Sequence, residues 1–123
     1  MRTDAKIIVW LGDSRAILRS FPKSVREKLG SDLRRLQLGK VPLDSKPMKT
    51  IGPGVRELRA QDRNNQYRIM YTVQSRIGIV VLHSFAKKSR VTPRSDIDLA
   101  RKRLRVFDRY SKGNSDGRNH HKR

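Results

Sequence analysis

The sequence predicts one small α+β domain, and three observations indicate it. The chain has 123 residues, which leaves room for a single domain, since domains cluster at about 100–150 residues. Its apolar residues make up 35% of the chain and fall in periodic blocks. The blocks have helical spacing near both ends and strand-like runs in the middle. We therefore expect an antiparallel sheet with an N-terminal helical hairpin and a C-terminal helix, within residues 1–110.

The first expected elements are a strand and two helices. Residues 6–11 (KIIVWL) form an apolar run of the length of a buried strand. A short helix is expected over residues 14–19, with Asp13 or Ser14 as its cap. The second helix spans residues 22–38, and its apolar residues recur at spacings of four, four and three, which places them on one stripe. These residues are Val25, Leu29, Leu33 and Leu36.

Three strands are expected in the middle of the chain. They follow a loop, residues 40–54, which holds three of the five prolines. In the second strand the alternate residues are apolar, namely Tyr67, Ile69, Tyr71 and Val73. Arg68 should therefore lie on the sheet face opposite the helices. The third strand, residues 77–85, is apolar at successive positions, as expected for a strand buried on both faces.

The last element is a helix followed by a polar segment. Thr92 and Pro93 are suited to the cap and the first helical position. The apolar residues after them have helical spacing and are Ile97, Ala100, Leu104 and Phe107. Residues 111–123 contain no apolar side chain, and we expect them to form a flexible basic tail.

The charge indicates a polyanionic partner. Thirty Lys and Arg against 11 Asp and Glu give a net charge of +19, which fits nucleic acid, a ribosomal surface, an acidic protein or an anionic membrane as the partner. The absence of cysteine excludes disulfides, thiol catalysis and cysteine-ligated zinc, and three histidines suggest no metal site, so no metal or cofactor is expected. No segment approaches the about 20 apolar residues of a membrane-spanning helix. We expect a soluble, cytoplasmic protein without a membrane partner.

Four motifs resemble those of one protein family. VRELR, QYRIMY, VLHSFAKKS and TPRSDIDLARKR occur in this order between residues 55 and 103, within a resemblance that covers about residues 6–107. Together they resemble the RelE/HigB toxin superfamily, most closely the phage-derived HigB-like toxins of type II toxin–antitoxin modules. The resemblance implies a RelE-like fold, in which helices cover one side of a twisted antiparallel sheet and the other side is basic and concave. It also implies a metal-independent endoribonuclease that cleaves messenger RNA on the ribosome and is inhibited by an antitoxin, expected to be a helix-turn-helix protein from an adjacent gene.

The resemblance also implies residues that bind the RNA backbone. Arg68 matches the family arginine that contacts the scissile phosphate. Lys87 and Lys88 match the basic pair after the last strand, and Lys88 stands where RelE-type members place a second phosphate-binding arginine. Further basic residues of the same stretch are expected to contact RNA, namely Arg56, Arg59, Arg63 and Arg90.

Three residues are candidates for proton transfer. Glu57 occupies a position that is basic in RelE-type members, and it can act as a base or hold Arg59 and Arg68 in place. His83 is either an acid/base group or a structural residue, because strand alternation places it with Ile79, Val81 and Phe85. The tyrosine that RelE-type members carry in a C-terminal segment has no aligned counterpart in this chain, and Tyr110 is the candidate for its role.

Two other functions fit the same fold and charge. One is a ParE-like toxin that inhibits DNA gyrase. The other is a basic nucleic-acid-binding module of phage origin without catalysis. Both require the positive charge, and neither requires an acid/base pair beside it.

Overall fold

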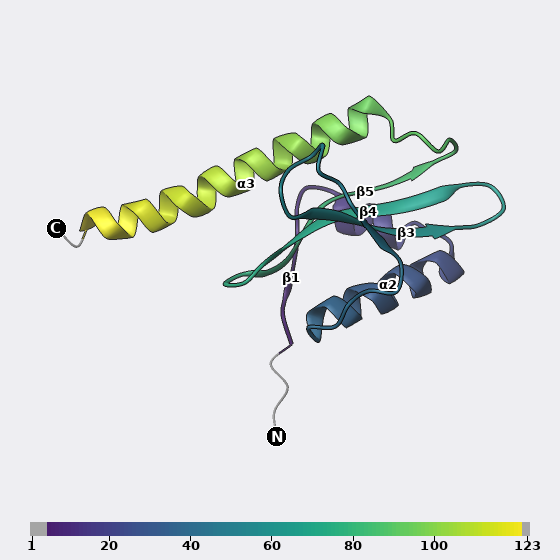
Figure 1. Cartoon of the computed structure of the whole chain (residues 1–123), viewed down its shortest axis with the longest axis horizontal. Helices are drawn as coiled ribbons and strands as arrows, with labels where there is room; N and C mark the ends of the chain where they lie inside the picture. Colours follow the sequence, from purple (N-terminus) through teal and green to yellow (C-terminus); the bar gives the residue numbers. More distant parts are fainter. Residues whose placement is uncertain (1–4, 122–123) are drawn as a thin grey trace, which may run out of the picture.

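The computed structural model describes residues 5–121, and side chains through residue 112. It has five strands and three helices, arranged as α+β (Figure 1). Along the chain they are β1 (Ile8–Trp10), α1 (Ser14–Arg19), α2 (Lys23–Gln37), β2 (Ser45–Pro47), β3 (Val55–Gln61), β4 (Gln66–Gln74), β5 (Gly78–Lys87) and α3 (Arg94–His121).

The strands form one sheet in the order β1-β5-β4-β3-β2. β1 pairs with β5 in parallel, and the other neighbours are antiparallel. β2 was not expected, because it lies inside the predicted loop of residues 40–54. Its Pro47 is tolerated because β2 is an edge strand, where one side of the backbone needs no ladder hydrogen bond.

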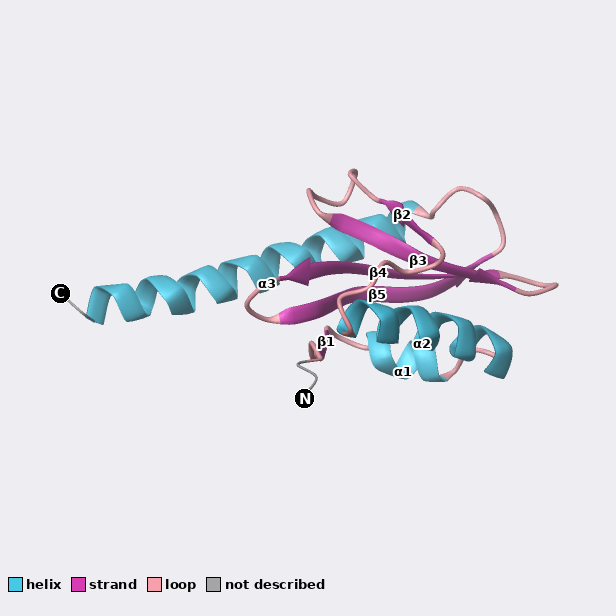
Figure 2. Ribbon diagram, turned by 60° about the horizontal axis from the view of Figure 1, so that its bottom comes forward, coloured by secondary structure: helices cyan, strands magenta, loops and turns pink. Residues whose placement is uncertain are grey.

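The helices cover both faces of the sheet (Figure 2). On one face the predicted stripe of α2 packs against Leu58, Ile69 and Tyr71. On the other face the predicted stripe of α3 packs against Met70 and Val80. Both stripes were predicted correctly. The family resemblance also implied that the helices cover only one side of the sheet, and this expectation is wrong. The successive apolar residues of β5 are explained by this arrangement, since both faces of β5 are buried.

A β-bulge changes the alternation of β5. Met70 pairs with His83 and Tyr71 pairs with Val81, which leaves Leu82 without a partner. A bulge shifts the later residues of a strand to the opposite face. His83 therefore lies on the α3 face with Phe85, whereas Val81 faces α1 and α2. The predicted grouping of His83 with Val81 is wrong for this reason.

α3 extends past the body of the sheet (Figure 1) and is helical to His121. The predicted domain end at residue 110 falls inside this helix. The flexibility predicted for residues 111–123 stays a prediction, and residues 122 and 123 lie outside the described part. Over residues 5–121, no helix is both long and apolar enough to cross a membrane.

Gly78→Ala is expected to lower the free energy of unfolding by about 1–3 kcal/mol. Gly78 has φ +134, and a Cβ there would overlap the carbonyl oxygen of Ile7. That oxygen accepts the N–H of Ile79 at 2.9 Å and so joins β1 to β5. Urea denaturation measures the change. Gly30→Ala is the matched control, because a Cβ at Gly30 meets nothing within 4 Å. This substitution replaces a glycine in the middle of α2 with a better helix former, so it should raise the free energy of unfolding by up to about 1 kcal/mol. Equal effects of the two substitutions would contradict the close contact at Gly78.

Candidate nucleic-acid interface

Four charged side chains from three strands gather on the α3 face of the sheet. We call Glu57, Arg59, Arg68 and Lys87 the basic cluster. Arg59 pairs with Arg68 across β3 and β4, and Lys87 lies at the end of β5, opposite Gln66. Because side chains alternate along a strand, this register places all four on one face. Arg68 lies on the face opposite α1 and α2, as the alternation of β4 predicted, but α3 packs on this face, so the expectation of a face without helices is wrong.

Arg68 is the central cation of the cluster and is only 3% exposed. Its Nη1 donates to the carbonyl oxygen of Tyr67 at 3.0 Å and more weakly to that of Ala60 at 3.4 Å. Its Nη2 donates to the side-chain oxygen of Gln66. Burial lowers the pKa of Arg68, and the carboxylate of Glu57 opposes that effect. The guanidinium is thus held in place by backbone and amide groups, with a carboxylate beside it.

Glu57 lies between two guanidinium groups and is 2% exposed. Its Oε1 is 3.4 Å from Nε of Arg68 and 3.8 Å from Nε of Arg59. Neither contact has hydrogen-bond geometry, and Oε2 of Glu57 and both Nε atoms are buried without a hydrogen-bond partner among the described residues. A buried charge without hydrogen bonds costs free energy, so folded proteins rarely keep one. The cluster therefore has unused donors and an unused acceptor next to each other, as ligand-binding sites do.

Lys87 contributes the third cation and is 6% exposed. Its Nζ donates to the carbonyl oxygen of Arg90 at 2.9 Å and to Oγ1 of Thr92 at 3.0 Å. Burial lowers the pKa of Lys87, and the positive charge of Arg68 lowers it further. A lysine in such surroundings gives up its proton more readily than a free lysine does.

Lys88 does not join the basic cluster. It follows the last residue of β5 and is exposed, and no hydrogen bond or ion pair within the described residues connects it to Arg68. Both lysines were expected at the site, but only Lys87 lies beside Arg68. Alternation explains the difference, since two successive residues at a strand end point to opposite faces.

A pocket of about 230 Å³ opens beside Arg59 and Arg68. Lys28 of α2 and Asp44 form its far wall. Nζ of Lys28 donates to the carboxylate of Asp44 at 2.8 Å and to the carbonyl oxygen of Arg59 at 3.0 Å. Asp32 of α2 accepts the N–H of Asp44 at 3.2 Å and so fixes the loop before β2. No local pattern in the sequence connects Lys28 with Asp44, so sequence reasoning missed both.

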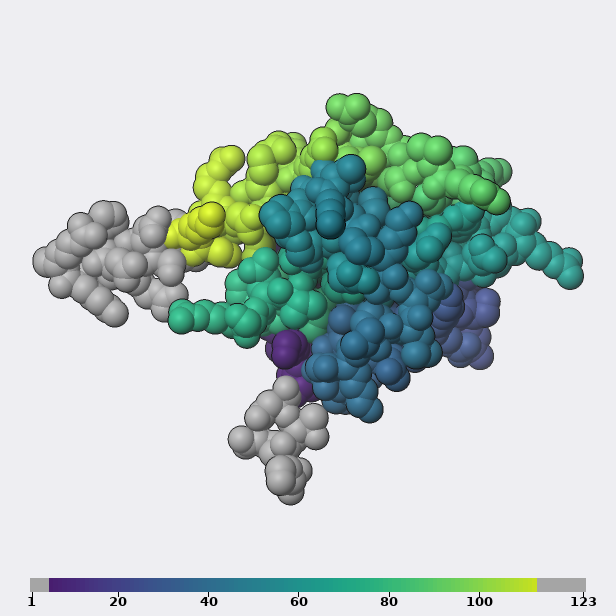
Figure 3. Space-filling model, in the orientation of Figure 1, coloured from purple at the N-terminus to yellow at the C-terminus, as the bar shows by residue number. Residues whose placement is uncertain are grey.

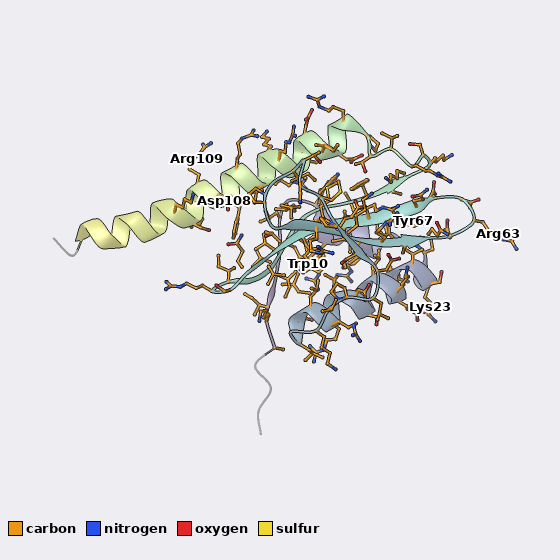
Figure 4. All side chains as sticks on the ribbon, in the orientation of Figure 1. Trp10, Lys23, Arg63, Tyr67, Asp108 and Arg109 are labelled. Atoms are coloured by element: carbon orange, nitrogen blue, oxygen red, sulfur yellow. The ribbon has the colours of Figure 1, made fainter. Side chains whose placement is uncertain are left out.

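The other predicted RNA contacts lie outside the cluster. Arg56 is on the α2 face, where its Nη2 donates to Oγ of Ser45 at 3.0 Å. Arg63 is exposed at the tip of the β3–β4 hairpin (Figure 4), which projects from the body of the molecule (Figure 3). Arg90 is exposed and reaches the cluster through its carbonyl oxygen alone. Of the four predicted contacts, only Arg59 is a member of the cluster.

His83 and Tyr110 also lie apart from the cluster. His83 is 4% exposed beneath α3, its Nε2 is 2.6 Å from Oδ1 of Asp96, and its ring stacks on Phe85. The structural alternative for His83 is the one that fits these contacts. Tyr110 lies fourteen residues further along α3 than Asp96, about 21 Å at the rise of an α-helix. Tyr110 lines another cavity together with Leu11 and Phe107, and not the pocket beside Arg59 and Arg68.

No group of three or more His, Cys, Asp or Glu side chains within the described residues is placed to hold a metal ion. Three cations and one carboxylate can bind a phosphate, stabilise added negative charge and transfer protons.

Comparison with known proteins identifies the family. No curated protein matches the chain. The family model described as "Phage derived protein Gp49-like (DUF891)" matches residues 16–105, from α1 to the middle of α3. This match covers most of the chain and includes all four residues of the basic cluster. The chain therefore belongs to the phage-derived Gp49-like family of toxin-like, RelE/HigB-type proteins.

Proposed function

We propose that this protein is the toxin of a type II toxin–antitoxin module and that it is a metal-independent endoribonuclease acting on messenger RNA. The observation that carries the proposal is the buried carboxylate of Glu57, with an unpartnered Oε2, on the same face as Arg68 and Lys87. A base, a phosphate-binding fork and a proton donor are the three groups that cleavage by a ribose hydroxyl requires.

In the proposed reaction the 2′-hydroxyl oxygen bonds to the adjacent phosphorus, and the bond from phosphorus to the 5′-oxygen breaks. Glu57 takes the proton of the 2′-hydroxyl. Arg68 and Arg59 bind the phosphate oxygens, whose negative charge grows in the transition state. Lys87 gives a proton to the leaving 5′-oxygen. The products are a 2′,3′-cyclic phosphate and a 5′-hydroxyl, and no further reactant is needed.

Arg59 controls access in this proposal. Its side chain is 38% exposed, whereas Glu57 and Arg68 are buried beside it. The pocket of about 230 Å³ reaches Arg59 and Arg68 from solvent. A phosphate entering there meets these two guanidinium groups first and competes with Glu57 for them. Displacement of Arg59 from Glu57 then opens the carboxylate to the ribose.

The proposed partners follow from the charge and the family. A net charge of +19 suits the ribosome, where messenger RNA is bound among other polyanions. A toxin of this kind needs a cognate antitoxin, for which we propose a helix-turn-helix protein from an adjacent gene. Both partners place the protein in the cytoplasm.

One observation favours a second function. Glu57, Arg68 and Lys87 are each no more than 6% exposed, as an ion-paired structural group would be. On that reading the protein is a basic module without catalysis or a ParE-like gyrase inhibitor, and its exposed arginines are the binding residues.

Pulse labelling after induction separates the two functions. Because the proposed enzyme removes messenger RNA, protein synthesis should stop first, while DNA synthesis continues. Glu57→Gln removes the base but keeps the size of the side chain, so it should restore protein synthesis. Arg63→Gln, at the exposed hairpin tip, is the control and should arrest growth as the unmodified protein does. Early arrest of DNA synthesis, or full activity of Glu57→Gln, would favour the second function instead.

A further inference from the structure

α3 has two apolar stripes, and only one of them packs against the sheet. The second stripe consists of Leu99, Val106 and Tyr110, which are seven and four residues apart and so lie on one side of the helix. Val106 is 53% exposed and Tyr110 is 69% exposed. Isolated exposed apolar residues are common, but a row of them along one helix marks an interaction surface.

The second stripe forms one wall of a groove of about 450 Å³. Leu11, which follows β1, and Phe107 of α3 also line the groove. The groove thus lies beside the stretch of α3 from Leu99 to Tyr110, and α3 continues past the body of the sheet (Figure 1). An apolar groove along a helix is the shape that accepts the apolar face of another helix.

The rim of the groove is strongly basic. Lys102 and Arg103 line it, where Arg103 is ion-paired with Asp13 at 2.8 Å. Arg105 and Arg109 lie in the same stretch of α3. From residue 99 to residue 110 the helix carries five basic residues and one acidic residue, Asp108. A second copy of this chain would bring the same charges to the groove, and like charges that face one another cost free energy. The charge therefore selects a partner with acidic residues beside its apolar stripe.

We propose that the groove between α3 and the end of β1 binds an amphipathic helix of another protein, with apolar residues on one face and acidic residues at its flanks. Leu99, Val106 and Tyr110 contact the apolar face, and Lys102 and Arg109 pair with the acidic flanks. The surface is distinct from the basic cluster, since none of the residues that line the groove belongs to the cluster or to the pocket beside Arg59 and Arg68. The inference stands whether or not the basic cluster cleaves RNA.

The probe for this surface is a synthetic helical peptide of about 20 residues, long enough to form a helix in water. It carries leucine at heptad a and d positions and glutamate at the flanking positions. A second peptide has lysine in place of glutamate, and a third keeps glutamate but has serine in place of leucine. Fluorescence anisotropy with the full chain should show binding of the first peptide alone. Binding of the lysine peptide, or equal binding of the serine peptide, would overturn the proposal.

The substitution pair Val106→Ser with Tyr110→Ser tests where the peptide binds. It removes two apolar anchors without a change in charge and should weaken binding by about ten-fold or more. The control pair is Val41→Ser with Val91→Ser, because both valines are exposed and lie outside the groove. Circular dichroism shows that each variant keeps the fold. Equal affinities of the two variants would overturn the proposal, and so would salt-independent self-association of the unmodified chain through the groove.

Discussion

Arg68→Lys is expected to lower the rate of messenger RNA cleavage by about 10²–10³-fold, although the substitution keeps the positive charge. The guanidinium of Arg68 is a planar fork held by the carbonyl oxygen of Tyr67 and the amide of Gln66. A lysine ammonium is a point charge and cannot bind two phosphate oxygens in that geometry. Cleavage of labelled messenger RNA on purified ribosomes measures the rate.

The matched control for this substitution is Arg63→Lys. Arg63 is exposed at the tip of the β3–β4 hairpin, so the same chemical change there should leave the rate within about two-fold, because a solvated cation contributes mainly its charge. Thermal unfolding of both variants shows whether a loss of rate comes from a loss of fold. A fully active Arg68→Lys protein would show that Arg68 is only a structural residue.

Lys87→Met is expected to lower the cleavage rate by about 10²–10⁴-fold, because it removes the proposed proton donor. Lys88→Met is the control beside it in the chain. Since Lys88 is exposed and outside the cluster, its substitution should leave cleavage nearly unchanged. A larger loss for Lys88→Met than for Lys87→Met would restore the assignment that the sequence alone favoured.

Lys87→Met also has an expected effect on stability as a function of pH. In the folded protein, burial and Arg68 lower the pKa of Lys87, while in the unfolded chain its pKa is about 10.4. Between these two values the folded protein binds fewer protons than the unfolded chain, so the free energy of unfolding of the unmodified protein rises with pH. A methionine side chain does not titrate, so it gives the variant no such rise. The free energy of unfolding of Lys87→Met minus that of the unmodified protein should therefore be greatest at a pH below both pKa values of Lys87, and should fall as the pH rises from the lower to the higher one.

Urea denaturation at a series of pH values measures this difference. The other charges around Lys87 are Glu57, Arg59, Arg68 and Lys46. A difference that stays constant up to a pH of about 10.4 would contradict the burial of Lys87.

Much of the fold follows from periodicity. The stripes of α2 and α3 and the alternation of β4 predicted which residues are buried, and the structure places them in its two cores. Periodicity does not say which sheet face a helix covers. The position of α3 on the second face could have been inferred from β5. The residues of β5 are apolar at successive positions, so both faces of this strand need to be covered. β2 was not predicted because Ser45, Lys46 and Pro47 do not show the alternation of apolar and polar residues that marks a strand. They form an edge strand that pairs with β3 alone.

The candidate site was predictable where strand alternation decides it. Alternation along β3 and β4 brought Glu57, Arg59 and Arg68 to one face, as expected. It failed for His83 because a bulge in β5 has no sequence signal here. The choice between Lys87 and Lys88 depended on one residue of register at the end of β5. Lys28 and Asp44 meet only because α2 lies beside the loop before β2, and such a contact between distant segments is invisible in a single sequence.

The most direct test of the central claim is the chemistry of the RNA ends that the protein produces. The protein is first stripped of metal with EDTA and then added to messenger RNA on ribosomes, and the cleavage site is mapped. A second RNA is then made that carries a 2′-deoxy nucleotide on the 5′ side of that site. Attack by the 2′-hydroxyl predicts a 2′,3′-cyclic phosphate and a 5′-hydroxyl from the first RNA and no cleavage of the second at that site. A 3′-hydroxyl end, equal cleavage of the deoxy RNA, or intact RNA under conditions where the protein stops translation would contradict it.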